Sequence, residues 1–171
     1  MKLILTMAMV TSLLLHAEGK EREEKNLYIG VGISAETPLW YNSGWSGALT
    51  IGKPLVKLGN GWLGAEGELT HSLQESSKNH IDFSATTFTG YATYIWNIDS
   101  KLYLKPRVGV VYKKYDIDSD IWGSDSNSEV GIAYGVGAGI RFSDNINLYA
   151  DYTLLENSDL THVTTGVEYH F

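Results

Sequence analysis

The chain has 171 residues, carries a formal net charge of −7 and contains no cysteine. Its length allows one domain with a sizeable interior, while the missing cysteines exclude disulfides, thiolate metal sites and a cysteine nucleophile. No block or stripe of lysine and arginine is present, so nucleic acid is not an expected partner.

The first residues have the pattern of a secretory signal peptide. Lys2 precedes an apolar and small-residue run that ends at Leu15, and Leu15-His16-Ala17 offers a small-residue cleavage site. The run is about 13 residues long, shorter than the roughly 20 residues that a membrane-spanning helix requires. The predicted organisation is a signal peptide over 1–17, a short polar leader over 18–25 and one domain over 26–171.

Beyond the leader, apolar and polar residues alternate in segments bounded by turn-forming residues, and no helical periodicity is present. Alternation with a period of two places successive side chains on opposite faces of a strand. The connecting segments mostly alternate between short turns and longer loops, which is typical of an antiparallel meander. Eight strands are predicted, over residues 26–34, 44–52, 62–72, 83–97, 102–116, 129–142, 146–154 and 161–171.

The polar faces of these strands do not resemble the surface of a water-soluble protein. They are rich in Gly, Ala, Ser and Thr, and segment 129–142 alone places four glycines there. Small residues and isolated charges of both signs suit a crowded interior in which the charges pair, although scattered solvent exposure is the alternative. The predicted lumen charge network consists of Glu66, Glu68, Lys105, Arg107, Arg141, Asp151 and Glu168.

The opposite faces carry aliphatic residues, with aromatic residues near the strand ends. Aromatic rings prefer the two interfaces of a bilayer, and a sheet can cross hydrocarbon only if it closes on itself. The predicted fold is therefore all-β, an eight-stranded antiparallel up-and-down transmembrane β-barrel without a wide pore. The predicted aromatic girdles consist of Trp40, Tyr41, Trp45, Trp96, Tyr112, Tyr115 and Phe142.

Three segments, GIAYGVGAGIRF, NLYADYTL and the terminal VTTGVEYHF, together with the signal peptide and the alternating strands, resemble the OmpA/OmpX-type small outer-membrane β-barrels of Gram-negative bacteria. The resemblance covers essentially the whole chain after the signal peptide. It implies a porin-like barrel in the bacterial outer membrane, with lipid, lipopolysaccharide, periplasmic chaperones and the assembly machinery as partners. It also implies a C-terminal assembly signal formed by Val163, Val167, Tyr169 and Phe171. The peptidoglycan-binding domain of full-length OmpA-like proteins is not expected.

Some barrels of this size modify lipid A with a serine, a histidine and an acid. The candidates in this chain are Glu68, His71 and Ser72, but adjacent residues of a regular strand point to opposite faces. His162 and His170 share a face but are too far apart to bind one metal ion together. No catalytic or metal site and no cofactor are therefore predicted.

The acidic stretch DIDSDIWGSDSNSE spaces its first aspartates as a calcium loop does. Ile121 and Asn127 occupy the positions of the glycine and the closing glutamate of such a loop, so divalent-cation binding by residues 116–129 stays open. The predicted function is that of a non-enzymatic outer-membrane barrel with a structural or surface-interaction role carried by extracellular loops, whose partner is unknown. The alternative is a small lipid A-modifying enzyme. A secreted soluble barrel with an apolar ligand conflicts with the polar inner faces.

Overall fold

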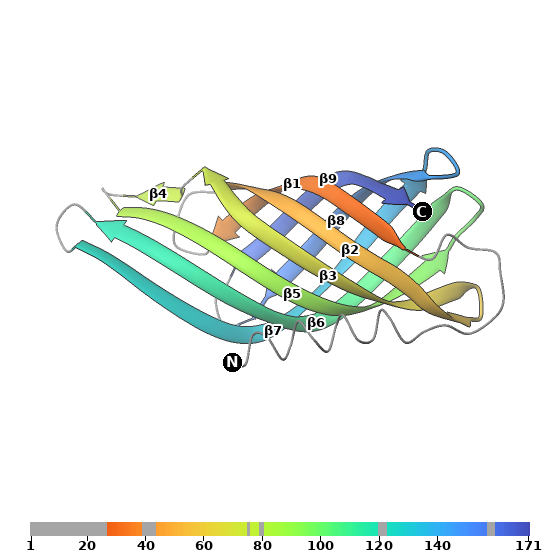
Figure 1. Cartoon of the computed structure of the whole chain (residues 1–171), viewed down its shortest axis with the longest axis horizontal. Helices are drawn as coiled ribbons and strands as arrows, with labels where there is room; N and C mark the ends of the chain where they lie inside the picture. The colour runs from red at the N-terminus through yellow and green to blue at the C-terminus, as the bar shows by residue number, and fades with distance from the viewer. Residues whose placement is uncertain (1–26, 39–43, 75, 79–80, 120–122, 157–159) are drawn as a thin grey trace.

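The structure is a computed structural model that describes residues 27–38, 44–74, 76–78, 81–119, 123–156 and 160–171. These residues form one antiparallel sheet of long, tilted strands (Figure 1). The strands are β1 (Tyr28–Pro38), β2 (Gly44–Leu58), β3 (Gly61–Gln74), β4 (Ser76–Lys78), β5 (Ile81–Asn97), β6 (Leu102–Ser119), β7 (Gly123–Arg141), β8 (Ile146–Leu155) and β9 (Leu160–His170).

The sheet closes on itself. Neighbouring strands in the chain pair with each other, and β1 also pairs with β9, with Tyr28 opposite His170. β3 pairs with β5, while the short β4 follows β3 along the same edge of β5. β3 and β4 therefore count as one strand of the ring, and the predicted eight-stranded up-and-down barrel is confirmed.

Within the described ranges, no helix has the length and apolar character needed to cross a membrane.

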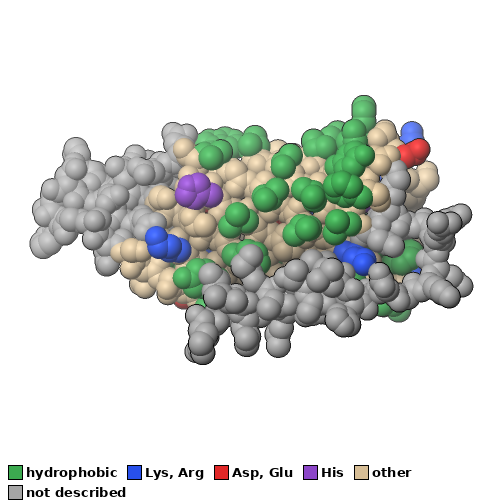
Figure 2. All heavy atoms as spheres, in the orientation of Figure 1, with side chains coloured by type: hydrophobic (Ala, Val, Ile, Leu, Met, Phe, Trp, Pro, Cys, Tyr) green, Lys and Arg blue, Asp and Glu red, His purple; other side chains and the backbone are tan. Residues whose placement is uncertain are grey.

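The two faces of the sheet are inverted relative to a water-soluble barrel. Val108 and Val136 are 55% and 48% exposed, whereas Glu66 and Lys105 are 0% and 1% exposed. Figure 2 shows hydrophobic side chains spread over the middle of the visible outer face. Charged and hydroxyl side chains fill the interior, and an aliphatic surface faces outward, as a barrel in hydrocarbon requires.

Glycines on the inner faces make room for large inner side chains. A Cβ atom at Gly139 would overlap the ring of Tyr103, and one at Gly137 would overlap Oδ1 of Asp151. Larger residues at these positions would displace groups that are buried in the lumen. Gly137 and Gly139 of β7 thus make room for side chains that β8 and β6 direct inward, whereas a Cβ atom at Gly135 would overlap the backbone carbonyl of Tyr152.

The hairpin formed by β6 and β7 extends much further than the sequence predicts. Asp116 lies opposite Ser126 and Asp118 lies opposite Ser124, so the strands continue to Ser119 and resume at Gly123. The prediction that residues 117–128 form a loop is wrong for residues 117–119 and 123–128, which lie in β6 and β7. Beyond Tyr115 the two strands are mostly polar in sequence, with Ile117 as an apolar exception, and backbone pairing continues the ladder where no sustained apolar alternation marks a strand.

Candidate functional site

The centre of the lumen holds a buried cluster of ion pairs. Nζ of Lys105 lies 2.8 Å from Oε2 of Glu66 and 2.9 Å from Oε1 of Glu168. Nη1 of Arg107 lies 2.9 Å from Oε1 of Glu66, 3.0 Å from Oε2 of Glu68 and 3.1 Å from Oδ2 of Asp151. Strands β3, β6, β8 and β9 supply these residues, so the cluster links opposite walls of the barrel.

The cluster supplies its own cation. Glu66, Glu68 and Asp151 each place one carboxylate oxygen within 4.8 Å of the others, a spacing that would suit a metal ion. Nη1 of Arg107 contacts an oxygen of all three carboxylates. The guanidinium therefore occupies the position in which a bound cation would balance these charges, and the geometry does not call for a metal.

Tyrosines surround the ion pairs. The hydroxyl of Tyr28 donates to Oε2 of Glu66 at 2.7 Å, and that of Tyr103 donates to Oε2 of Glu168 at 3.0 Å. The Arg107 guanidinium lies 4.5 Å from the ring centroid of Tyr91. Alternation along β1 places Tyr28 on the inner face, but the sequence does not reveal that these hydroxyls complete the hydrogen bonding of the carboxylates.

Beyond Arg107, toward the long β6–β7 hairpin, one wall of the lumen is apolar. Val111, Ala133, Leu155 and Leu160 form a buried cluster with Tyr91, and each is at most 4% exposed. The ion pairs and this apolar cluster are consecutive along the barrel axis, since Val111 lies two inner positions beyond Arg107 on β6. The middle of the lumen is therefore packed with side chains.

A second buried polar group joins β1, β3 and β9 inside the barrel. Nε2 of His162 lies 3.5 Å from Oε1 of Glu36, and Ser72 donates a 3.0 Å hydrogen bond to Oε2 of Glu36. Glu36 and His162 are both 1% exposed. The serine bonds to the carboxylate and not to the imidazole, so the group lacks the order of a nucleophile activated by histidine. Sequence reasoning missed this group, although alternation in β1 and β9 directs both residues inward.

The predicted catalytic candidates on β3 are not brought together. His71 is exposed on the outer face, where its Nδ1 atom lies 2.9 Å from Oγ1 of Thr86. Ser72 points inward toward Glu36, and Glu68 is held by Arg107. The regular alternation of the strand separates the hydroxyl from the imidazole, as the sequence predicts.

Arg141 lies outside the ion-pair cluster, in contrast to the prediction. Its Nη2 atom donates to Oδ1 of Asn97 at 2.5 Å, and its guanidinium lies 5.4 Å from the ring centroid of Tyr103. Arg141 is four residues beyond Gly137, which pairs with Asp151, and this displacement along β7 moves it out of the cluster by about 13 Å. It faces the mouth of the barrel at the short-turn end.

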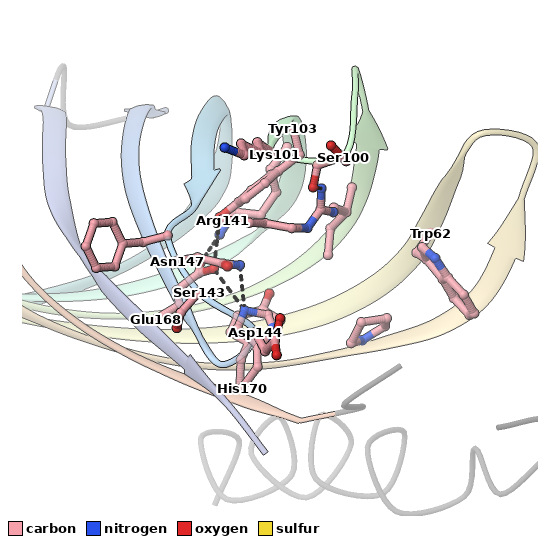
Figure 3. Close-up of a pocket in the computed structure, with 15 residues that line it drawn as sticks. Trp62, Ser100, Lys101, Tyr103, Arg141, Ser143, Asp144, Asn147, Glu168 and His170 are labelled. Atoms are coloured by element: carbon pink, nitrogen blue, oxygen red, sulfur yellow. Dashed lines mark hydrogen bonds and ion pairs between the residues drawn. The ribbon is translucent and has the colours of Figure 1, made fainter. Parts of the chain in front are cut away.

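This mouth contains a cavity of about 570 Å³. Figure 3 shows Tyr103, Lys101 and Arg141 in the upper part of the view, Glu168 and His170 below them, and Trp62 apart from them on the right. The amides of Leu102 and Lys101 donate to Asp99 in the neighbouring turn and lower the pKa of its carboxyl group. Lys105 and Glu168 also line the cavity, so the ion-pair cluster borders it on the inner side.

Not all of the predicted girdle residues lie on the outer face of the barrel. Trp45, Trp96 and Phe142 are exposed on the outer face, at 50%, 49% and 72%. Tyr115 differs from the prediction: it shares the inner face with Lys113, whose Nζ atom lies 6.0 Å from its ring centroid. Tyr112 and Tyr115 are three residues apart on one strand, so they cannot share a face. Trp40 and Tyr41 lie outside the described residues.

The last strand presents its alternating apolar side chains outward. Val163, Val167, Tyr169 and Phe171 are all 40–58% exposed. The rings of Tyr169 and Phe171 meet edge to face, with centroids 5.1 Å apart. The amide of Phe171 donates to the carbonyl of Leu27 at 3.0 Å, so the backbone of this residue joins β9 to the start of β1.

Solved structures with the same fold come from several bacteria. Ail, the attachment invasion locus protein of Yersinia pestis, is 20% identical with a TM-score of 0.63, over 87% of this chain and 100% of Ail. The N-terminal β-barrel domain of Pseudomonas aeruginosa OprF is 14% identical with a TM-score of 0.62, over 88% and 100%. Neisserial surface protein A is 14% identical with a TM-score of 0.59, over 85% and 97%.

The comparison with curated proteins gives no match. The family profile described as "Outer membrane protein beta-barrel domain" matches residues 3–171. This match spans nearly the entire chain and agrees with the closed sheet, the polar lumen and the apolar outer face. The chain belongs to the outer membrane protein beta-barrel domain family.

Proposed function

We propose that the protein is a non-enzymatic barrel of the outer membrane whose surface-interaction role is carried by the long extracellular hairpin and loops. The observation that supports this proposal best is the packed lumen, in which Lys105 and Arg107 bind four carboxylates beside a buried apolar cluster. As far as the described residues show, the interior offers no wide passage for a solute. Interaction with other molecules is therefore left to the ends of the barrel.

The charge of the β6–β7 hairpin indicates the chemistry of its partner. Residues 116–129 contain four aspartates and one glutamate, and no lysine or arginine. Ail has been solved in complex with the heparin analogue sucrose octasulfate, which is a polyanion. An acidic hairpin repels polyanions and attracts cationic partners, so the expected partner of this chain has the opposite charge.

This expectation is tested with the folded protein in lipid nanodiscs. Poly-L-lysine should bind, and neutralising Asp116, Asp118, Asp120 and Asp125 to asparagine should weaken binding about tenfold, which corresponds to about 1.4 kcal/mol. Sucrose octasulfate should not bind either protein. Unchanged poly-L-lysine binding by the variant, or binding of sucrose octasulfate to the parent protein, would contradict a cationic partner. Heat-modifiable gel mobility shows that the variant barrel is folded.

Catalysis on lipid A receives no support from the described residues. His71 and Ser72 face opposite sides of β3, and Ser72 is hydrogen-bonded to Glu36. His162, which is buried in the lumen, contacts Glu36 through its Nε2 atom. We therefore retain the non-enzymatic role.

We further propose that Val163, Val167, Tyr169 and Phe171 form the segment that the outer-membrane assembly machinery reads. Deletion of Phe171 should lower the amount of barrel in the outer membrane, because it removes an exposed terminal ring and the hydrogen bond to Leu27. Substitution of Phe171 by tyrosine should preserve assembly. Membrane fractionation with quantitative immunoblotting measures both variants, and wild-type levels of the deletion variant would contradict the proposed signal.

A further inference from the structure

Glu36 and His162 form a buried pair whose facing atoms are not hydrogen-bonded. Nε2 of His162 lies 3.5 Å from Oε1 of Glu36, and both side chains are 1% exposed. A hydrogen bond between nitrogen and oxygen spans about 2.7–3.2 Å, so this separation is too long for one. Neither atom has another hydrogen-bond partner. Buried polar atoms without a partner are rare in folded proteins, and two that face each other point to a further bound group.

Among the described residues, no neighbouring side chain supplies a positive charge to Glu36. The residue opposite it on β2 is Gly44, which has no side chain. Lys113 on β6 is also buried, but its Nζ atom donates to the carbonyl oxygen of Glu156 at 2.8 Å. His162 is therefore the one ion-pair partner of Glu36 within the described ranges. A buried carboxylate needs a compensating cation, so the position between these two side chains favours positive charge.

We propose that Glu36 and His162 bind a divalent transition-metal ion such as Zn²⁺ inside the barrel. Zinc lies about 2.0–2.2 Å from imidazole nitrogen and carboxylate oxygen, so an ion between atoms 3.5 Å apart makes an angle of about 110–120° with them, close to tetrahedral. A water molecule bonded to both atoms at about 2.8 Å in tetrahedral geometry would hold them about 4.5 Å apart. The observed spacing fits a metal ion and neither a direct hydrogen bond nor a bridging water.

The surroundings orient the carboxylate for this role. Ser72 donates a 3.0 Å hydrogen bond to Oε2 of Glu36, which leaves Oε1 directed toward His162. Hydrogen bonds of this kind hold metal ligands in position. Ser46, which lies opposite Ser72 on β2, is 0% exposed, and its hydroxyl has no hydrogen-bond partner. Water or this hydroxyl can occupy the remaining positions of a four-coordinate site.

A second pair of histidine and glutamate shows that spacing alone is not sufficient. Nε2 of His170 lies 3.6 Å from Oε2 of Glu168. This nitrogen is already within 2.8 Å of Nδ2 of Asn147, and Glu168 accepts hydrogen bonds from Lys105 and Tyr103. The facing atoms of this pair thus have other partners. We expect no metal ion there, and the pair serves as an internal control.

Cobalt tests the site, because Co²⁺ replaces Zn²⁺ in tetrahedral sites and absorbs visible light there. Protein without a histidine tag is purified from the outer membrane, unfolded in urea and refolded into detergent micelles with Co²⁺, so that the ion can reach the buried pair. One Co²⁺ per barrel should bind with a tetrahedral spectrum. Zn²⁺ should displace it, whereas Mg²⁺ and Ca²⁺, which prefer oxygen ligands, should not.

The variants His162→Gln and Glu36→Gln should each weaken Co²⁺ binding by more than about tenfold, since loss of a mere supporting hydrogen bond already costs about 10–100-fold. His170→Gln, the matched control, should bind Co²⁺ as the parent protein does. Absence of the tetrahedral spectrum in the parent protein, its persistence in either ligand variant, its loss in His170→Gln, or displacement by Ca²⁺ would each overturn the proposal. Heat-modifiable mobility verifies that every variant forms the closed barrel.

Discussion

Replacement of Arg107 by methionine should destabilise the folded barrel by about 3–5 kcal/mol, the loss typical of a buried ion pair that is deprived of one partner. Arg107 contacts Glu66, Glu68 and Asp151, and its side chain is fully buried. Methionine fills much of the same space but leaves the carboxylates without their shared cation. Unfolding in urea, with the barrel reconstituted in lipid vesicles, measures the change in free energy.

Arg141→Met provides the matched control. The hydrogen bonds of this guanidinium go to the side chain of Asn97 and to backbone carbonyls at the mouth, so its removal leaves no buried carboxylate unpaired. The expected loss is less than about 1 kcal/mol, as for exposed polar contacts. Equal losses for the two variants would show that Arg107 has no special role in balancing charge in the lumen.

Replacement of Val108 by arginine should cost about 2–4 kcal/mol, the penalty for a cation on the lipid face near the bilayer midplane. Val108 is 55% exposed in the structure, so the new side chain meets hydrocarbon and not a packed core. The same urea titration in vesicles measures the penalty. Its size depends on the depth of the substituted residue in the membrane.

Val130→Arg is the control for depth. Val130 is also exposed on the outer face of its strand, but it lies opposite Tyr112, which the sequence predicts to lie at an interface. Near an interface the expected cost falls to about 0–1 kcal/mol, because the guanidinium reaches the lipid head groups. Equal costs at Val108 and Val130 would contradict the expected position of the barrel in the bilayer.

The sequence predicts the fold well because one face of each strand meets lipid and the other meets the lumen, so apolar and polar residues alternate strictly along the strand. Alternation places Val108 and Val136 on the outer face and Glu66 and Lys105 on the inner face, and the structure has them on these sides. The sequence does not predict where β6 ends and where β7 begins. Beyond Tyr115 the two strands are mostly polar and carry no sustained apolar alternation, so the residue types do not predict strands there, and only the backbone pairing reveals them.

The sequence predicts only part of the site, because alternation assigns a residue to a face of the sheet but does not give its position along the barrel axis. It places Arg141 and Asp151 on the inner face, yet the register between β7 and β8 decides that Arg141 reaches the mouth and not the cluster. Alternation in the sequence does not predict contacts across the lumen either. Glu36 and His162 come from opposite ends of the chain, and only closure of the barrel brings them within 3.5 Å.

The pairing of β1 with β9 also constrains when the barrel can form. These hydrogen bonds join segments from opposite ends of the described chain, and such distant contacts carry a large entropic cost and slow folding. Until β9 is present, β1 has an open edge whose amides and carbonyls hydrocarbon cannot satisfy. Strands therefore cannot enter the bilayer stably one by one as they leave the ribosome. Insertion follows synthesis of the last strand, and the chain must be kept from aggregating until then.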